Sequence, residues 1–344
     1  MHILTVDGHT INRSETFDEA DLDAALARFD ELSSAARLKN TATHAHSKLA
    51  DGYNSRDVEQ FLALHDGRYE DRRQGGLRDS GTVDSNFATA TLLEALPGWH
   101  WEATTLAIRG KRLSLHLDTI RDTADTGSPV AVELLMLTEV DDTGRIVFAV
   151  AFDSDGIEAA FAELDARYLA GEAATYARTW AAVADGYAAF NRRELFKTTP
   201  DWVNIDHRRG GTAFAPGEQM ALVDATWRVV PEIHAYAEYV HRLDGTAAVV
   251  TQIVKATSQE GFDGEWREVI LLTVDGDAIS RCEVFDESEI DAALARFAEL
   301  GRQAHRLVNA ATRTREDLIT AFGRRDLDAF RTFITPGWSI RRSS

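Results

Sequence analysis

Three consecutive polar residues, Asp206, His207 and Arg208, are the best candidates for catalytic chemistry, because they end a predicted strand just before a pair of glycines. Side chains alternate along a strand, so Asp206 and Arg208 point to one face and His207 points to the other, with Val203 and Ile205. If that apolar face lines a pocket, His207 is a general base that works near neutral pH. The alternative is structural: Asp206 pairs with Arg208 and stabilises the turn.

A second version of this motif, Asp71-Arg72-Arg73, keeps the aspartate and an arginine but has arginine in the place of the histidine. Asp71 is therefore a candidate ligand-binding residue in its own part of the chain. Two copies of a motif need not share a chemistry. The loss of the base from one copy nevertheless indicates that a shared activity is not what maintains both.

Three further residues on predicted strands are candidate ligand-binding groups. Glu133 and Glu268 alternate with apolar neighbours in VELLMLT and REVILLT, so each reaches a pocket if its face is buried. Burial would raise the pKa of such a carboxyl group; the alternative for both is an ion pair with an arginine on the next strand. Tyr236 lies on a long strand with other aromatic residues, and it is either a proton donor in a pocket or a packing residue.

Composition excludes several kinds of partner and chemistry. The formal net charge is −19, from 56 acidic and 37 basic residues, and such a field repels phosphate backbones and anionic lipids. We therefore expect neither nucleic acid nor a membrane as a partner. Cys282 is the only cysteine, which excludes an intrachain disulfide and a cysteine zinc cage and favours a cytoplasmic location. Phosphate loops, HExxH motifs and nucleophile elbows do not occur, so we expect no metal and no cofactor.

The elements that must position these residues belong to an internal repeat. The segment from Ile3 to Leu32, ILTVDGHTINRSETFDEADLDAALARFDEL, returns without a gap from Leu271 to Leu300, with most positions identical. A weaker copy lies midway, from Thr138 to Leu164. The chain is therefore an array with a period of roughly 134 residues.

Each complete repeat begins with helices, continues with a short strand, a crossing helix and several long antiparallel strands, and ends with a closing helix. This order predicts an α+β fold. In the first complete repeat the crossing helix is predicted over 87–96, where Pro97 ends it. The predicted boundaries are the C-terminal strands and helix of an incomplete repeat at 1–35, complete domains at 36–169 and 170–300, and the first helices and strand of an incomplete repeat at 301–344.

Three segments carry a resemblance to a known family: the helix end FNRREL (190–195), the strand WVNIDHR (202–208) and the closing strand that ends in Phe285-Asp286. They resemble nuclear transport factor 2-like (NTF2-like) proteins of the SnoaL-like branch. The resemblance covers nearly the whole chain and implies tandem cystatin-like cone domains, each a curved antiparallel sheet wrapped around helices. The family includes polyketide cyclases, ketosteroid isomerases, epoxide hydrolases, dehydratases and non-catalytic proteins, and fold alone does not choose among them. The repeated FDxxxxDAALARFxEL motif also resembles C-terminal parts of large actinobacterial regulatory proteins.

Two functions are consistent with these observations. The first is a non-catalytic module that binds an apolar small molecule or another surface within a larger regulatory protein, its cone domains paired through sheet faces as an intramolecular pseudo-dimer or a homo-oligomer. The second is an isomerase, cyclase or hydrolase that acts on a polyketide, steroid or epoxide, with His207 or Asp206 as base and Arg208 or a tyrosine as partner. Catalysis requires at least two of these groups to converge on one enclosed volume. The diverging polar residues of the repeats favour the first function.

Overall fold

The structure is a computed structural model. It describes residues 2–7, 10–18, 21–22, 25, 38–74, 98–122, 131–208, 217–230, 232–257, 263–307 and 310–333. The predicted helix at 87–96, the glycine pairs at 75–76 and 210–211 and the strand predicted from 335 lie outside these residues. The chain forms two compact units, Met1–Ile290 and Asp291–Ser344, and the first unit contains the first predicted complete repeat and residues 170–290 of the second.

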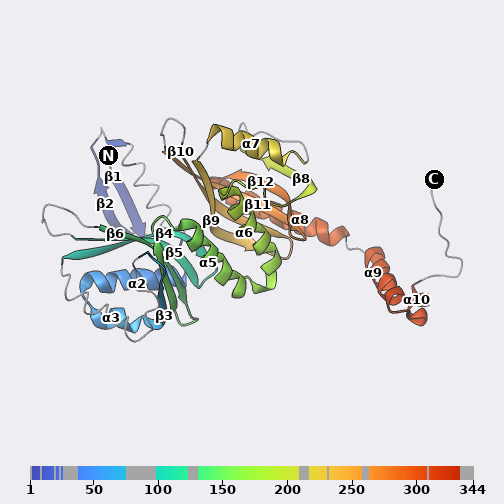
Figure 1. Cartoon of the computed structure of the whole chain (residues 1–344), viewed down its shortest axis with the longest axis horizontal. Helices are drawn as coiled ribbons and strands as arrows, with labels where there is room; N and C mark the ends of the chain where they lie inside the picture. Colours follow the sequence, from blue (N-terminus) through green and yellow to red (C-terminus); the bar gives the residue numbers. More distant parts are fainter. Residues whose placement is uncertain are drawn as a thin grey trace. The chain divides into compact units, whose positions relative to one another are not determined.

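The first complete repeat is one five-stranded sheet with helices (Figure 1). The sheet order is β3-β7-β6-β5-β4, and every neighbouring pair is antiparallel except β3 with β7. In chain order the elements are α2 (Thr41–Ser55), α3 (Val58–Ala63), β3 (His65–Asp71), β4 (Trp99–Arg109), β5 (Leu113–Asp122), β6 (Ala131–Val140), β7 (Ile146–Asp153) and α5 (Ile157–Ala170).

The second complete repeat has the same plan. Its sheet order is β8-β12-β11-β10-β9, and only the β8–β12 pair is parallel. Its elements are η2 (Ala174–Tyr176), α6 (Ala177–Asn191), β8 (Thr198–Asp206), α7 (Gln219–Val229), β9 (Glu232–Leu243), β10 (Ala247–Thr257), β11 (Asp263–Asp275), β12 (Ala278–Asp286) and η3 (Glu287–Glu289).

These two sheets confirm the predicted α+β fold with tandem repeats. Three of the four strand pairs in each sheet are antiparallel, as predicted, and one pair is parallel. β8 is the first strand in sequence, yet it pairs with the last, so no hairpin fixes its direction and it runs parallel to β12. Register shifts between β9 and β10 and between β4 and β5 mark the irregularities that bend the long strands.

The same helix ending occurs in three places. Arg56, Arg193 and Arg325 have φ angles of 61°, 59° and 56°, in the left-handed region that non-glycine residues rarely adopt. They follow the related sequences YNS, FNR and FGR, at the ends of α2, α6 and α9 (Ala310–Gly323). A backbone feature thus recurs in step with the sequence repeat.

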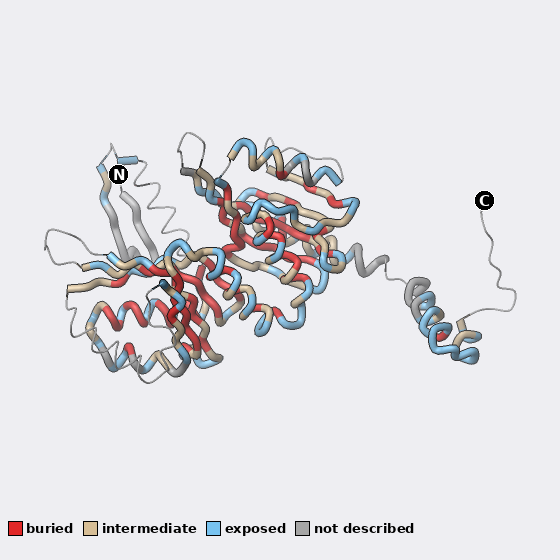
Figure 2. Tube along the Cα trace, viewed as in Figure 1, coloured by how far each residue is buried: buried red, intermediate tan, exposed pale blue. Residues whose placement is uncertain are grey.

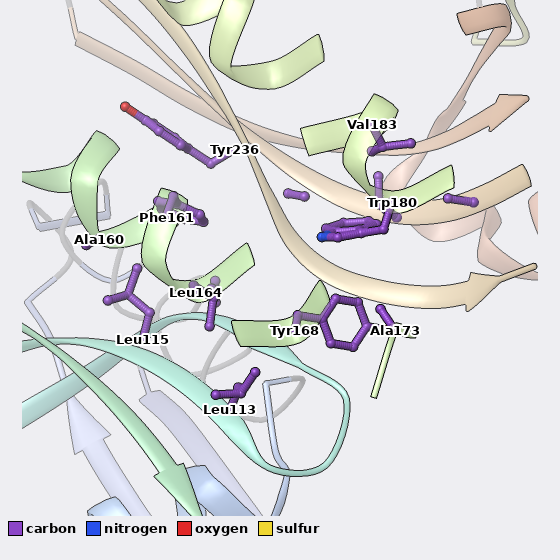
Figure 3. Close-up of a cluster of buried hydrophobic side chains, with 14 of the residues drawn as sticks. Leu113, Leu115, Ala160, Phe161, Leu164, Tyr168, Ala173, Trp180, Val183 and Tyr236 are labelled. Carbon is purple, nitrogen blue, oxygen red and sulfur yellow. The ribbon is translucent and has the colours of Figure 1, made fainter. Parts of the chain in front are cut away.

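The two complete repeats share a hydrophobic core, and α5 lies within it. Buried residues are concentrated in the two sheets and in the helices against them (Figure 2). Phe161 of α5 stacks on Tyr236 of β9 with ring centroids 4.6 Å apart, and Tyr168 of α5 meets Trp180 of α6 edge-on at 5.5 Å (Figure 3). Aromatic pairs of this kind contribute about 0.5–1.5 kcal/mol each beyond their buried area. Pairing of the repeats therefore occurs within one chain, and association of several chains stays a prediction.

The remaining elements lie at the two ends. β1 (His2–Asp7) and β2 (Thr10–Thr16) form a separate antiparallel pair. The second unit contains α9, α10 (Leu327–Thr332) and most of α8 (Ile290–Leu307). Ile319, Phe322 and Leu327 are exposed there. None of the helices that the structure describes is long and apolar enough to span a lipid bilayer.

Candidate functional site

The second repeat contains a half-open cavity of about 360 Å³ between the sheet and the helices α6 and α7. This volume lies at the lower end of the range of small-molecule sites, roughly 300–1,000 Å³. Aliphatic side chains from β9, β11 and β12 form much of its wall. Aromatic side chains also line it: Tyr187, Phe190, Phe196, Trp202 and Trp266.

Helix α6 forms one wall because its apolar residues recur at helical spacing. Val183, Gly186, Tyr187 and Phe190 lie on one stripe of the helix and all line the cavity. Gly186 lets α6 pack closely on the sheet, since a Cβ atom there would lie 2.9 Å from Ile279 Cδ1. A larger residue at position 186 would require the end of the Ile279 side chain to move.

A bidentate ion pair forms the polar edge of the cavity. Arg208 donates from Nε to Asp206 Oδ1 at 2.9 Å and from Nη2 to Asp206 Oδ2 at 2.7 Å. The backbone N–H of Arg208 also donates to Asp206 Oδ1, at 3.0 Å. Both carboxylate oxygens of Asp206 therefore already accept charge-assisted hydrogen bonds.

Glu268 joins this pair to the helix. Its Oε1 accepts hydrogen bonds from Arg208 Nη1 and from Trp266 Nε1, the latter at 3.1 Å. Its Oε2 accepts from Gln252 Nε2 at 2.8 Å, and Gln252 Oε1 accepts from the Tyr187 hydroxyl at 2.9 Å. A continuous chain of hydrogen bonds thus crosses the cavity wall from α6 through β10 and β11 to the end of β8.

Three titratable groups of the cavity, Asp206, Tyr187 and Cys282, have shifted pKa values. Hydrogen bonding from Arg208 lowers the pKa of Asp206, although partial burial opposes it. Burial raises the pKa of Tyr187 well above its usual value. Burial, with the nearby charge of Glu268, raises the pKa of Cys282 to about 12. At neutral pH these three groups are therefore a carboxylate, a neutral phenol and a neutral thiol.

His207 does not line the cavity, and neither do Val203 and Ile205, so the apolar face of β8 that would make His207 the inward group is not the face at this cavity. The inward residues of β8 are Trp202, Asn204 and Asp206. His207 Nε2 lies instead 2.8 Å from Oε2 of Glu283, whose side chain is fully buried, and the imidazole stacks on Phe285 at 4.4 Å. The apolar alternation of Val203 and Ile205 had indicated the opposite face.

Asp71 repeats the ion pair in the first repeat. Arg73 donates from Nε to Asp71 Oδ1 at 2.9 Å and from Nη2 to Asp71 Oδ2 at 2.7 Å. The backbone N–H of Arg73 donates to the same Oδ1 at 3.2 Å. Asp71 is 3% exposed. The same three bonds occur at both places, as expected for an element that stabilises the strand end.

Glu133 is not the structural counterpart of Glu268. Glu268 lies opposite Asp286 in its sheet, and Asp153, the counterpart of Asp286, lies opposite Leu134. Glu133 is therefore one residue out of step, and it is exposed. A shift of one residue along a strand moves a side chain to the other face.

Tyr236 also faces away from the cavity. Its ring belongs to the shared core, against Phe161, whereas its neighbours Ile233 and Ala235 line the cavity. Burial raises the pKa of Tyr236 to about 12. The residue is therefore a neutral packing group at neutral pH.

In the first repeat, a buried cluster of polar side chains lies on the sheet face that corresponds to the cavity face of the second repeat. The sequence did not predict this cluster. His46 Nε2 lies 2.9 Å from Asp118 Oδ1, and His46 Nδ1 lies 3.0 Å from Thr138 Oγ1. The His46 ring stacks on His116 at 3.8 Å. Asp118 lies opposite Leu134 just as Gln252 lies opposite Glu268, so it corresponds to Gln252. The signal was a histidine within the apolar stripe of α2.

The described residues contain no group of three or more His, Cys, Asp or Glu side chains arranged to hold a metal ion. The cavity instead combines apolar walls with one polar edge, which suits an uncharged organic molecule with a few hydrogen-bonding groups.

No protein-family model and no curated protein matches the chain. Among solved structures it is similar to a protein described as a SnoaL-like polyketide cyclase from Jannaschia sp. CCS1, with 16% identity and a TM-score of 0.29 over 32% of this chain and 86% of that one. It is also similar to a Mycobacterium tuberculosis protein in complex with estradiol-17β-hemisuccinate, with 18% identity and a TM-score of 0.28 over 33% of this chain and 93% of that one. A third is an NTF2-like protein of unknown function from Burkholderia pseudomallei, with 18% identity and a TM-score of 0.27 over 32% of this chain and 91% of that one. These structures include the SnoaL-like and NTF2-like classes that the sequence resembles.

Proposed function

We propose that the second repeat binds an apolar small molecule in its cavity and does not convert it chemically. The observation that carries this proposal is the half-open cavity of about 360 Å³ with aromatic and aliphatic walls and a polar edge. Such a site gains affinity from the burial of apolar ligand surface, about 25 cal/mol per Å². The polar edge orients the ligand.

The hydrogen bonds at the polar edge favour binding over catalysis. A general base must accept a proton, and its pKa must lie near the working pH. Asp206 has a lowered pKa, and both of its oxygens accept hydrogen bonds from Arg208. Glu268 likewise accepts from three donors. Since the first repeat has the same ion pair at Asp71 and Arg73, a structural role accounts for the motif.

The alternative is an isomerase, cyclase or hydrolase that acts on a polyketide, steroid or epoxide. One observation favours it: Asp206, Arg208 and Glu268 converge on the same cavity. A ligand that displaced Arg208 from one carboxylate would release a base and leave a cation beside it. Under this alternative, Asp206 or Glu268 is the base and Arg208 stabilises developing negative charge.

A wider context belongs to the same proposal. The repeated array and the FDxxxxDAALARFxEL motif support a module of a larger, actinobacterial regulatory protein. The single cysteine supports a cytoplasmic location. Mass spectrometry of the protein purified from its source tests the first point, because a mass equal to that of these 344 residues would contradict it.

The binding proposal is tested by titrating the full chain with N-phenyl-1-naphthylamine, a neutral apolar fluorophore. We expect saturable binding at one site, with a blue-shifted emission and quenching of the tryptophans. Steroids, polyketides and epoxides are then tested as competitors and, by mass spectrometry, for conversion. Absence of saturable binding would contradict the proposal, and catalytic conversion of a competitor would establish the alternative.

A further inference from the structure

One wall of the cavity is a helix that the first repeat holds in place. α6 contributes Val183 and Tyr187 to the cavity, and Trp180, on the same stripe of the helix, lies in the core shared by the repeats. Trp180 is fully buried and meets Tyr168 of α5 edge-on, with ring centroids 5.5 Å apart. Figure 3 shows Trp180 and Val183 on this helix, with Tyr168 beside the indole. The position of α6 therefore depends on α5, the closing helix of the first repeat.

A polar cluster fixes Trp180 in this position. One carboxylate oxygen of Asp165 accepts hydrogen bonds from Trp180 Nε1 at 3.0 Å and from Arg109 Nε at 2.7 Å. The guanidinium carbon of Arg109 lies 5.0 Å from the centre of the Trp180 ring. These three residues, the Arg109 cluster, join β4 and α5 of the first repeat to α6 of the second.

The Arg109 cluster places a charged side chain in a core that is otherwise mainly hydrophobic. The Arg109 side chain is fully buried, and its Nη2 has no hydrogen-bond partner among the residues that the structure describes. Burial of a guanidinium carries a desolvation cost that apolar residues of similar volume avoid. The cluster contributes a directional hydrogen bond. Because Trp180 Nε1 donates to Asp165, the orientation of the indole, and hence of α6, is fixed.

The same helix, α5, also contacts a second wall of the cavity. Phe161 stacks on Tyr236 of β9 at 4.6 Å, and the residue before Tyr236, Ala235, lines the cavity. α5 therefore holds both α6 and β9 from outside the cavity. A movement of α5 changes the separation of these two walls.

We propose that the first repeat positions the cavity of the second, and that Arg109, Asp165 and Trp180 are positioning residues for ligand binding. The inference rests on the proposed function, since it concerns the same cavity. Loss of the cluster allows α6 to shift, which weakens the bond between Tyr187 and Gln252 and opens the cavity. The first repeat then contributes to binding without touching the ligand.

Cys282 provides a test that needs no ligand, because it is the only cysteine and it lines the cavity. In the full chain, Asp165→Leu should raise the rate of Cys282 modification by methyl methanethiosulfonate about fivefold or more, because Cys282 is half-buried and a shift of α6 widens the cavity that it lines. Trp180→Phe, which keeps the aromatic ring and removes the N–H donor, should raise it less. Asp165→Asn keeps an acceptor for Trp180 and should partly restore the slow rate.

Glu163→Gln is the matched control. Glu163 lies on the same helix and accepts hydrogen bonds from Arg72 at 2.9 Å and Arg167 at 2.8 Å, both in the first repeat. Its loss weakens ion pairs of α5 without touching α6. We expect the modification rate of this variant to equal that of the unchanged protein.

Affinity for N-phenyl-1-naphthylamine gives the second readout. We expect Asp165→Leu to raise the dissociation constant about tenfold and Glu163→Gln to leave it unchanged, at a temperature where both variants are folded. The inference would be overturned if Asp165→Leu and Glu163→Gln had equal Cys282 modification rates and equal affinities for the fluorophore. It would also be overturned if, in both variants, the rate and the affinity changed only in proportion to the decrease in melting temperature. If Asp165→Leu does not fold, the modification rate and the fluorophore affinity of Trp180→Phe are compared with those of Glu163→Gln instead.

The two proposals fail in different ways. If the unchanged protein does not bind the fluorophore but the Cys282 rates respond to the Arg109 cluster, the proposed function is wrong and the positioning role holds. If the fluorophore binds and neither rate nor affinity responds, the positioning role alone is wrong.

Discussion

Trp101 in the first repeat and Ala235 in the second occupy equivalent positions. The backbone N–H of each donates to an asparagine in the last turn of a long helix of its repeat, Trp101 to Asn54 of α2 at 2.8 Å and Ala235 to Asn191 of α6 at 2.9 Å. The Trp101 indole meets the buried His46 ring edge-on at 5.4 Å, whereas Ala235 lines the cavity. The tryptophan therefore fills space in the first repeat that the alanine leaves open in the second.

The first prediction places the tryptophan of the first repeat at the equivalent position of the second. Ala235→Trp should place an indole in the cavity and weaken binding of N-phenyl-1-naphthylamine at least about tenfold, since the ligand and the side chain need the same volume. The melting temperature should stay within a few degrees or rise, because the new ring fills a cavity and not a packed core.

Val229→Trp is the control, since Val229 is 73% exposed and does not line the cavity. Fluorescence titration and a thermal melt of both variants check the prediction. Unchanged affinity in Ala235→Trp would show that the fluorophore binds elsewhere.

The order of elements was predictable because repeats and helix endings are local signals. YNSRD and FNRRE mark the ends of α2 and α6, and the apolar periodicity of each helix is visible in the sequence. The inward face of β8 was not predictable in the same way. Apolar alternation favours the face of Val203 and Ile205 as the buried one, but the cavity has a polar edge, so Asp206 faces inward.

Hydrogen bonds between residues far apart in the sequence could not be predicted either. Tyr187 belongs to the apolar stripe of α6, and only the folded chain shows its bond to Gln252. The mismatch of Glu133 with Glu268 has a simple cause. The connection between β6 and β7 is longer than the connection between β11 and β12. A sequence alignment that matches TEVDD (138–142) to TVDGD (273–277) therefore places β6 one residue out of register with β11.

The second prediction separates the two faces of β8 if the screen finds a catalytic activity. Asp206→Asn should lower kcat about 100-fold or more, because the carboxylate lies at the cavity. His207→Ala should leave kcat within about twofold, because its imidazole lies on the other face beside Glu283. Steady-state kinetics on the substrate found in the screen measure both. Loss of activity in His207→Ala with an unchanged melt would restore His207 as the base.

The third prediction concerns acid stability. Burial, with the charge of His46, lowers the pKa of His65 to about 4, and burial lowers the pKa of His116 well below its usual value. Below pH 6.5 the unfolded chain binds protons at these positions and the folded chain does not. The free energy of unfolding therefore falls as the pH falls from about 6.5 to 4, by up to about 1.4 kcal/mol per pH unit for each histidine.

His65→Asn should flatten this decline, and His44→Asn, a substitution at an exposed position of the neighbouring helix, should not. Urea unfolding between pH 7 and pH 4.5 gives the slope for each variant. Identical slopes for His65→Asn and the unchanged protein would contradict the lowered pKa.

The last prediction concerns the buried pair in the first repeat. Both side chains are almost completely buried, at 0% exposure for His46 and 1% for Asp118, and their facing atoms are 2.9 Å apart. Asp118 Oδ2 has no hydrogen-bond partner within the described part of the chain. In the second repeat a valine, Val183, stands at the same distance before the helix-ending asparagine as His46 does, so an apolar residue is compatible with this fold position.

His46→Val alone should therefore lower the free energy of unfolding by about 3–5 kcal/mol, because it leaves the Asp118 carboxylate buried without its partner. His46→Val/Asp118→Val should recover most of that loss, since two apolar residues remove the desolvation cost together with the ion pair. Urea unfolding of both single variants and the double variant gives the coupling energy directly. If the losses of the single variants simply add in the double variant, the pair contributes no coupling, and the buried contact between His46 and Asp118 does not stabilise the first repeat.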